Sequence, residues 1–169
     1  FKPGVFRPPY PADSSISLYL TINEFGERIT HTPDAPVSDR QAFIIGGSFV
    51  LGSGLSDEQT FSWKLQARHP ELDVHNLGVG GYGTYQSLLT LEQALTRLQN
   101  PDVVIYGFIS HHQTRNVAHS QWLEILEYSA QSKEGVAVPY VTLYKEGILR
   151  GHPPLELTHV PFDTQSVLA

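Results

Sequence analysis

The sequence predicts an α/β domain built on a parallel β-sheet. Residues 42–109 alternate between short apolar runs and longer stretches with helical periodicity, in the order strand, helix, strand, helix, strand. Strands that alternate with helices in this way pair in parallel through right-handed crossovers. The chain has 169 residues, 40% of them hydrophobic and 17% charged, which is enough for one domain with its own core.

Three short segments are expected to form the strands. Residues 42–45 and 103–106 are apolar and are expected to be buried, and residues 73–77 are expected to form a second short strand between them in sequence. A continuous apolar run is typical of a strand that is buried on both faces of a parallel sheet. Functional loops of such sheets lie at the carboxyl ends of the strands. In this chain those loops are residues 46–54, 78–83 and 110–116.

Two helices are expected between these strands. The first begins near Asp57 and Glu58, whose charges suit the positive end of a helix dipole, and it ends before Pro70. The second begins at Thr84, a predicted N-cap. Its apolar side is a stripe of leucines at alternating spacings of three and four residues. These are Leu88, Leu91, Leu95 and Leu98.

The chain before residue 42 lacks this alternation. Residues 1–41 are rich in Pro, Gly, Ser and Thr, and the early prolines deny them a regular helix. We expect an N-terminal extension that contains one short strand over residues 15–22, followed by a turn over residues 23–26.

Residues 42–169 are expected to form one α/β domain in two parts. The core with the alternating pattern occupies residues 42–116, and residues 117–169 are expected to insert one helix and one hairpin. The predicted elements of the insertion are a helix over residues 120–131, a strand over 136–144, a turn at Glu146-Gly147 and a second strand from residue 148.

Charge and composition exclude several classes of function. The net charge is −6 and no basic cluster stands out, so no nucleic-acid-binding surface is expected. The absence of cysteine excludes disulfide scaffolds, cysteine nucleophiles and Cys-ligated zinc. No apolar run approaches the roughly 20 residues of a membrane-spanning helix, so we expect no membrane span in this chain.

Ser48 is the first candidate for chemistry. It follows a predicted buried strand and two glycines, where a sharp turn would expose its hydroxyl and aim its own N–H at a developing oxyanion. The alternative is a small residue in a tight strand-to-helix turn. The glycine-rich loop 78–83 and the loop 46–54 lack the acidic residue and the lysine of nucleotide-binding motifs, so no cofactor is expected.

Three segments, in this order, resemble the catalytic blocks of the SGNH/GDSL hydrolase superfamily. Residues 46–52 (Gly-Gly-Ser-Phe-Val-Leu-Gly) correspond to Gly-Asp-Ser-x-x-x-Gly, residues 76–87 carry Gly81 at the oxyanion-hole glycine, and residues 107–116 stand at the third block. The resemblance covers residues 42–116. It implies a three-layer α/β/α sandwich with a parallel, flavodoxin-like sheet, which we expect to be incomplete at the C-terminus.

The resemblance also implies an activity, that of an esterase, lipase, acylhydrolase or acyl transferase with Ser48 as nucleophile. The oxyanion would be held by the N–H groups of Ser48 and Gly81 and by His111, which stands where the family has an Asn and has a ring N–H to donate. The substrate would be a small-molecule, lipid or carbohydrate ester. The candidates for binding it are His112, Arg115 and Tyr82.

Each of these side chains also has an ordinary structural interpretation. His111 and His112 can be surface histidines of a loop, Arg115 can brace that loop, and Tyr82 can pack as an amphipathic aromatic residue. A metal site that uses the histidines would need convergent ligands which the spacing does not supply, so no metal is expected. The sequence leaves the oligomeric state open.

Two departures from the family pattern remain. The acid before the serine is replaced by Gly47, and the final Asp-x-x-His block is missing, although an unactivated serine is a poor nucleophile. The nearest substitute pairs Glu156 with His159, which an extended chain would place on opposite faces. We expect the base to lie outside this chain, which starts with Phe and would be exported or membrane-anchored through an upstream segment. The alternative function is a non-catalytic carbohydrate- or lipid-binding module.

Overall fold

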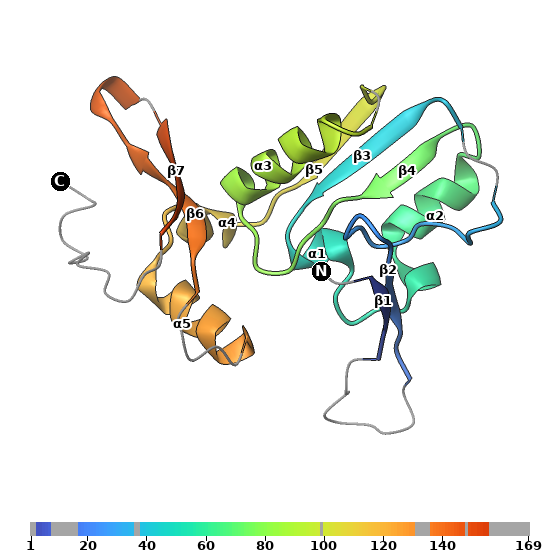
Figure 1. Cartoon of the computed structure of the whole chain (residues 1–169), viewed down its shortest axis with the longest axis horizontal. Coiled ribbons are helices and arrows are strands. Elements are labelled where there is room, and N and C mark those ends of the chain that lie inside the picture. Colours follow the sequence, from blue (N-terminus) through green and yellow to red (C-terminus); the bar gives the residue numbers. More distant parts are fainter. Residues whose placement is uncertain are drawn as a thin grey trace.

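The computed structural model describes residues 3–7, 17–35, 38–98, 100–130, 136–147 and 149–155. Its centre is a parallel three-stranded sheet in the order β4-β3-β5 (Figure 1). The strands are β3 (Gln41–Gly46), β4 (Asp73–Asn76) and β5 (Val103–Gly107). Ala42 of β3 lies opposite Val74 on one side and Val103 on the other. The predicted α/β class with a parallel sheet is therefore confirmed.

Helices cover both faces of this sheet. Alternate residues of a strand point to opposite faces, and β3 divides its side chains between two apolar clusters accordingly. Ala42 and Ile44 pack with Leu65 of α2 (Phe61–Arg68). Phe43 and Ile45 pack with Leu91 and Ala94 of α3 (Thr84–Leu95). Both faces of β3 are buried, which explains its uninterrupted apolar sequence. The predicted burial of β5 is wrong, because β5 is an edge strand of the described sheet and its residues 103–105 are exposed.

The two predicted helix starts are wrong by a few residues. Asp57–Gln59 forms a separate 3-10 turn, η1, and α2 begins at Phe61 after the N-cap Thr60, whose Oγ1 accepts a hydrogen bond from the Trp63 N–H at 3.2 Å. The N-cap of α3 is Gly83, and Thr84 is the first helical residue. Because the Gly83 cap has no side chain, Asn116 Oδ1 accepts a hydrogen bond from the Tyr85 N–H in the first turn of α3, at 3.0 Å.

The buried side of α3 also differs from the predicted leucine stripe. Leu91 and Leu98 pack against the sheet cluster, but Leu88 and Leu95 are exposed by 46% and 39%. Ala94 is buried in their place, at 2% exposure. A small side chain at this position lets the helix axis approach the sheet, and it rotates the neighbouring leucine toward solvent.

The N-terminal extension forms a small antiparallel pair. β1 (Gly4–Phe6) pairs with β2 (Leu20–Ile22), so the described part of the predicted strand is shorter than expected, and residues 15 and 16 lie outside the described residues. The predicted turn over 23–26 is confirmed, since the Gly26 N–H donates to the Asn23 carbonyl at 3.1 Å and Gly26 has φ +83°.

The remaining elements lie beyond the sheet. They are α1 (Ser48–Leu51), α4 (His112–Asn116), α5 (Ser120–Ala130), β6 (Val138–Leu143), the turn η2 (Lys145–Gly147) and β7 (Leu149–Leu155). The predicted helix and hairpin are confirmed, although β7 continues to Leu155 through residues for which no pattern was predicted. Trp122, Leu123 and Val138 form a small core of their own. Figure 1 shows α5 and the hairpin beyond α4, away from β1 and β2.

No helix in the described part of the chain is both long enough and apolar enough to cross a membrane.

A buried arginine joins the N-terminal extension to the loop after α1. Arg28 is 1% exposed, and its Nε donates to Asp57 Oδ1 at 2.9 Å. Its Nη1 donates to the carbonyls of Leu51 and Gly52, each at 2.8 Å, and its Nη2 donates to the carbonyl of Leu55 at 2.7 Å. The guanidinium thereby holds the whole turn that follows α1, and removal of either charge would leave the other one buried and uncompensated.

We expect Arg28→Met to lower the free energy of unfolding by about 3–5 kcal/mol, because it leaves Asp57 as an unpaired buried charge. Urea denaturation of both proteins measures the difference. The control is Arg40→Met, which breaks the exposed ion pair with Asp102 (Nε to Oδ1, 3.2 Å) and should cost about 0–1 kcal/mol. Equal losses in the two variants would contradict a structural role for the buried pair.

Candidate functional site

Ser48 is the first residue of α1 and directly follows the carboxyl end of β3. Gly46 makes the turn with φ +152°, and a Cβ there would lie 2.5 Å from Val50 Cγ2 and 2.9 Å from the Gly107 carbonyl oxygen. Ser48 is half-buried, and within the described part of the chain neither its Oγ nor its N–H has a hydrogen-bond partner. A free hydroxyl therefore stands at the start of a helix, at the edge where parallel sheets carry their functional loops.

Three groups converge on Gly47, the residue before Ser48. A Cβ on Gly47 would lie 2.9 Å from the Tyr82 carbonyl oxygen, 3.0 Å from His112 Nε2 and 3.1 Å from Arg115 Nη1. Arg115 Nη1 also donates to that Tyr82 carbonyl, at 3.0 Å. The structure thus brings together three residues that the sequence nominates for substrate binding, from the loop before α3 and from α4.

His112 is fully buried beneath this cluster. Its Nδ1 lies 2.6 Å from the Tyr106 hydroxyl, which in turn donates to Thr84 Oγ1 at 2.7 Å. The Nε2 atom of the same ring is buried without a partner among the described residues. Burial, the Arg115 charge and the neighbouring His111 all lower the pKa of His112, so the ring is neutral at pH 7.

Gly81 lies in the neighbouring loop with φ +84°, a conformation that favours glycine. A Cβ there would lie 3.0 Å from Leu126 Cδ2 and 4.0 Å from Trp122 Nε1, so α5 covers this side of the loop. Trp122 itself is only 7% exposed. The Gly81 N–H donates to no acceptor among the described residues, so it is available to a ligand.

His111 lies apart from this cluster. It is the N-cap of α4, its side chain is exposed, and its imidazole makes no hydrogen bond within the described ranges. The imidazole that lies against Gly47 belongs to the next residue, His112. The role of His111 as an oxyanion donor therefore stays a prediction.

Further side chains hold the loops in place, and the sequence analysis nominated neither Gln86 nor Tyr106 among them. Asn116 Oδ1 accepts from the Tyr85 N–H at 3.0 Å, and Gln86 Oε1 accepts from the Gly83 N–H at 2.9 Å. Gln86 Nε2 reaches the Pro139 carbonyl of β6 at 2.6 Å. Tyr106, which positions His112, is the one polar side chain in the strand Val103–Gly107, and that contrast was the available signal.

The sequence analysis also weighed a substitute base and a metal site. Glu156 and His159 lie outside the described residues. Within the residues that the structure describes, no group of three or more His, Asp or Glu side chains is arranged to hold a metal ion.

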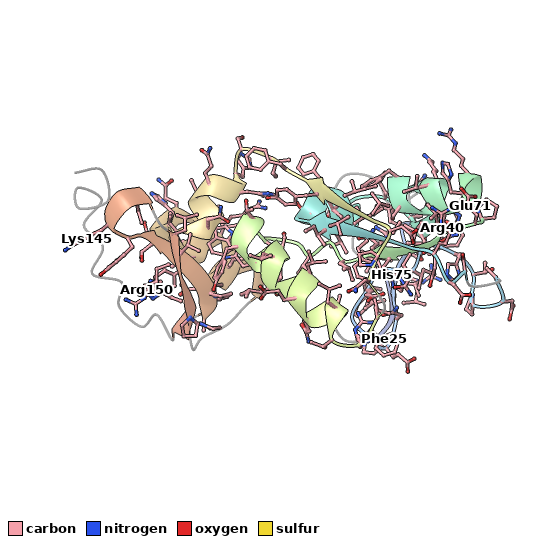
Figure 2. All side chains as sticks on the ribbon, turned by 90° about the horizontal axis from the view of Figure 1, so that it is seen from above. Phe25, Arg40, Glu71, His75, Lys145 and Arg150 are labelled. Carbon is pink, nitrogen blue, oxygen red and sulfur yellow. The ribbon has the colours of Figure 1, made fainter. Side chains whose placement is uncertain are left out.

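A second polar cluster lies at the other end of the strands. His75 of β4 is 3.0 Å from Glu27 through Nδ1 and 3.2 Å from Asp73 through Nε2. Arg97, which follows α3, pairs with Glu27, and its guanidinium lies 4.6 Å from the centre of the Phe25 ring. These residues line a cavity of about 270 Å³. Figure 2 shows Phe25 and His75 far from Lys145 and Arg150 of the hairpin.

The charges in this cluster are matched within the protein. Burial alone would lower the pKa of His75, but the hydrogen bonds and charges of Asp73 and Glu27 outweigh it and raise the pKa to about 9. The imidazolium therefore neutralises part of the carboxylate charge that it contacts at pH 7. We interpret the cluster as a brace that holds residues 27–31 against β4.

Comparisons with known proteins give a partial likeness in fold. No protein-family model matches the chain, and no curated protein matches it in sequence. The solved structure of AlinE4, an SGNH-hydrolase family esterase, is similar with a TM-score of 0.42 and 21% identity, over 58% of this chain and 56% of that chain. The structure of a mutant of the esterase AlinE4 is similar with a TM-score of 0.41 and 21% identity, over 54% of this chain and 51% of that chain.

The chain thus spans about half the length of the structures that it matches. These likenesses concern the arrangement of the α/β core, and no activity or residue role is carried over from them.

The raised pKa of His75 predicts a loss of stability at alkaline pH. A group whose pKa is higher in the folded than in the unfolded state stabilises the fold below the unfolded value of 6.5 and loses that effect as pH rises through about 9. We expect the free energy of unfolding to fall over this range, and His75→Gln to remove much of that fall. His69→Gln, at an exposed His–Glu pair, should keep it. Identical pH profiles in wild type and His75→Gln would refute the assignment.

Gly47→Ala should destabilise the fold by about 1–3 kcal/mol, since its methyl group would crowd a backbone carbonyl that cannot move aside. Thermal or urea unfolding measures the loss. Gly80→Ala is the matched control in the neighbouring loop, because the nearest atom to its new Cβ is Leu51 Cδ2 at 3.8 Å. A Gly47→Ala protein as stable as Gly80→Ala would mean that the loops are not in the contact described.

Proposed function

We propose that the protein is a serine-dependent ester hydrolase or acyl transferase of the SGNH/GDSL type, with Ser48 as its nucleophile. The observation that carries the proposal is the unengaged hydroxyl of Ser48 at the start of α1, next to N–H groups of Ser48 and Gly81 that no described residue uses. A nucleophile and two free donors at one strand edge are the parts that acyl transfer needs. The resemblance of residues 42–116 to the family's sequence blocks supports the same function.

The proposed reaction follows from these groups. Ser48 Oγ forms a bond to the ester carbonyl carbon while a general base takes its proton, and the N–H groups of Ser48 and Gly81, with the His111 ring N–H, hold the negative oxygen. The ester C–O bond then breaks, and the leaving alcohol takes the proton from the base. Water releases the acyl group in hydrolysis, and an acceptor alcohol takes it in transfer.

The general base is proposed to come from an Asp-x-x-His block outside residues 1–169. Among the described residues, no imidazole or carboxylate is hydrogen-bonded to Ser48 Oγ. His112 is not assigned this role, because its Nδ1 is bound to Tyr106 and its buried Nε2 makes no hydrogen bond with Ser48. It is instead a positioning residue that packs against Gly47.

The surroundings of Ser48 support an ester with an apolar portion. Leu126 and Trp122 cover the Gly81 loop, and Phe49, directly after the proposed nucleophile, is 72% exposed. A small-molecule, lipid or carbohydrate ester would meet apolar surface on this side. The second candidate is a non-catalytic carbohydrate- or lipid-binding module, which the unengaged Ser48 hydroxyl also permits.

Covalent labelling separates the two functions. We expect a fluorophosphonate probe to label the protein that carries residues 1–169 together with its Asp-x-x-His block, and that protein to hydrolyse short para-nitrophenyl esters. Ser48→Ala should abolish labelling and lower kcat/KM by at least about a thousandfold.

Ser53→Ala, at an exposed serine that follows the same helix, is the control and should keep both activities. Equal labelling of Ser48→Ala and wild type would exclude Ser48 as the nucleophile. A folded wild type that is neither labelled nor active would favour the binding module.

A further inference from the structure

The carboxyl edge of the sheet is free of acidic residues, although the chain as a whole is acidic. None of the 17 Asp and Glu residues lies in residues 46–56, 77–91 or 107–123, the three segments that surround Ser48. The same segments contain Arg115 and the histidines 111, 112 and 119. In a chain with a net charge of −6, these segments therefore carry a single fixed charge, the positive charge of Arg115, which favours an anionic ligand.

Arg115 carries an uncompensated charge at this edge. Arg28, Arg40 and Arg97 each form an ion pair with a carboxylate. The half-buried Arg115, by contrast, has one neutral acceptor, the Tyr82 carbonyl, and no carboxylate partner among the described residues. Burial accordingly lowers the pKa of Arg115. The guanidinium edge formed by Nε and Nη2 keeps its donors free, and this fork matches the two oxygens of a carboxylate.

A second, independent observation points to the same place. His112 is 0% exposed, yet its Nε2 has no partner among the described residues, which is an unusual cost for a buried polar atom. Nε2 of His112 and Nη1 of Arg115 lie at nearly the same distance, 3.0 and 3.1 Å, from the position of a Cβ on Gly47. Gly47 supplies no side chain to compensate either group.

We propose that the substrate of this site is an ester that also carries a carboxylate, and that Arg115 binds this carboxylate beside Ser48. The proposal rests on the proposed function for the reaction, but the binding step stands by itself. The apolar wall of Trp122 and Leu126 at Gly81 and the cationic side of Arg115 at Gly47 then contact different ends of one substrate. The ester carbonyl lies between them, at the Ser48 hydroxyl.

Two esters of the same acyl length test the proposal. Para-nitrophenyl hydrogen succinate carries a carboxylate, and para-nitrophenyl butyrate is its neutral counterpart. We expect wild type to hydrolyse the succinate ester with a kcat/KM at least about tenfold higher, and Arg115→Gln to raise KM for the succinate ester at least about tenfold more than for the butyrate ester. Arg150→Gln, at an exposed arginine of the hairpin, is the control and should leave this ratio unchanged (Figure 2).

Equal kcat/KM values for the two esters in wild type, or an equal loss on both in Arg115→Gln, would overturn the proposal and leave Arg115 with its bracing role alone. Arg115→Lys, which keeps the charge but loses the fork, should lie between wild type and Arg115→Gln.

A binding measurement keeps this inference separate from the proposed reaction. Isothermal titration of Ser48→Ala with succinate needs no turnover, and it should give a saturable signal that Ser48→Ala/Arg115→Gln lacks. If succinate binds to Ser48→Ala but wild type shows no esterase activity, the anion site is supported and the hydrolase is refuted. Activity on the butyrate ester without succinate binding would support the hydrolase and refute the anion site.

Discussion

The buried ion pair of Arg28 with Asp57 is the interaction on which the arrangement around Ser48 depends. One guanidinium binds Asp57 and the carbonyls of Leu51, Gly52 and Leu55, which together form the turn after α1. These carbonyls lie where a short helix ends and has no further N–H groups of its own to offer. The N-terminal extension therefore closes the turn at the end of the short helix whose first residue is the candidate nucleophile.

Close backbone contacts bring the other loops to the same point. A Cβ on Gly47 would crowd Tyr82, His112 and Arg115, and a Cβ on Gly83 would lie 2.9 Å from the His112 carbonyl oxygen. Such contacts leave room for glycine alone, so the glycines of two loops are spacers as much as turn residues. The result is an edge at which the loop before α3 and the helix α4 lie against Gly47, the residue before Ser48.

Charge is distributed over the fold in a way that suits this edge. At the far end of the strands, His75 and Arg97 neutralise Glu27 and Asp73 within the protein. At the Ser48 edge the acids are absent, and Arg115 is left without a carboxylate among the described residues. The cluster around Glu27 stabilises the fold, whereas the positive charge of Arg115 at the Ser48 edge is available to a ligand.

The sequence by itself determined three strands that pair in parallel and the position of Ser48 at the end of the first, since strand–helix alternation and glycines at strand ends are local patterns. The tertiary structure decided which helix faces are buried: Ala94 rather than Leu95 faces the sheet, because helix–sheet distance is set by both layers. It also decided that His112 rather than His111 lies against Gly47. Such partners are distant in sequence, so no periodic pattern of residue types predicts them.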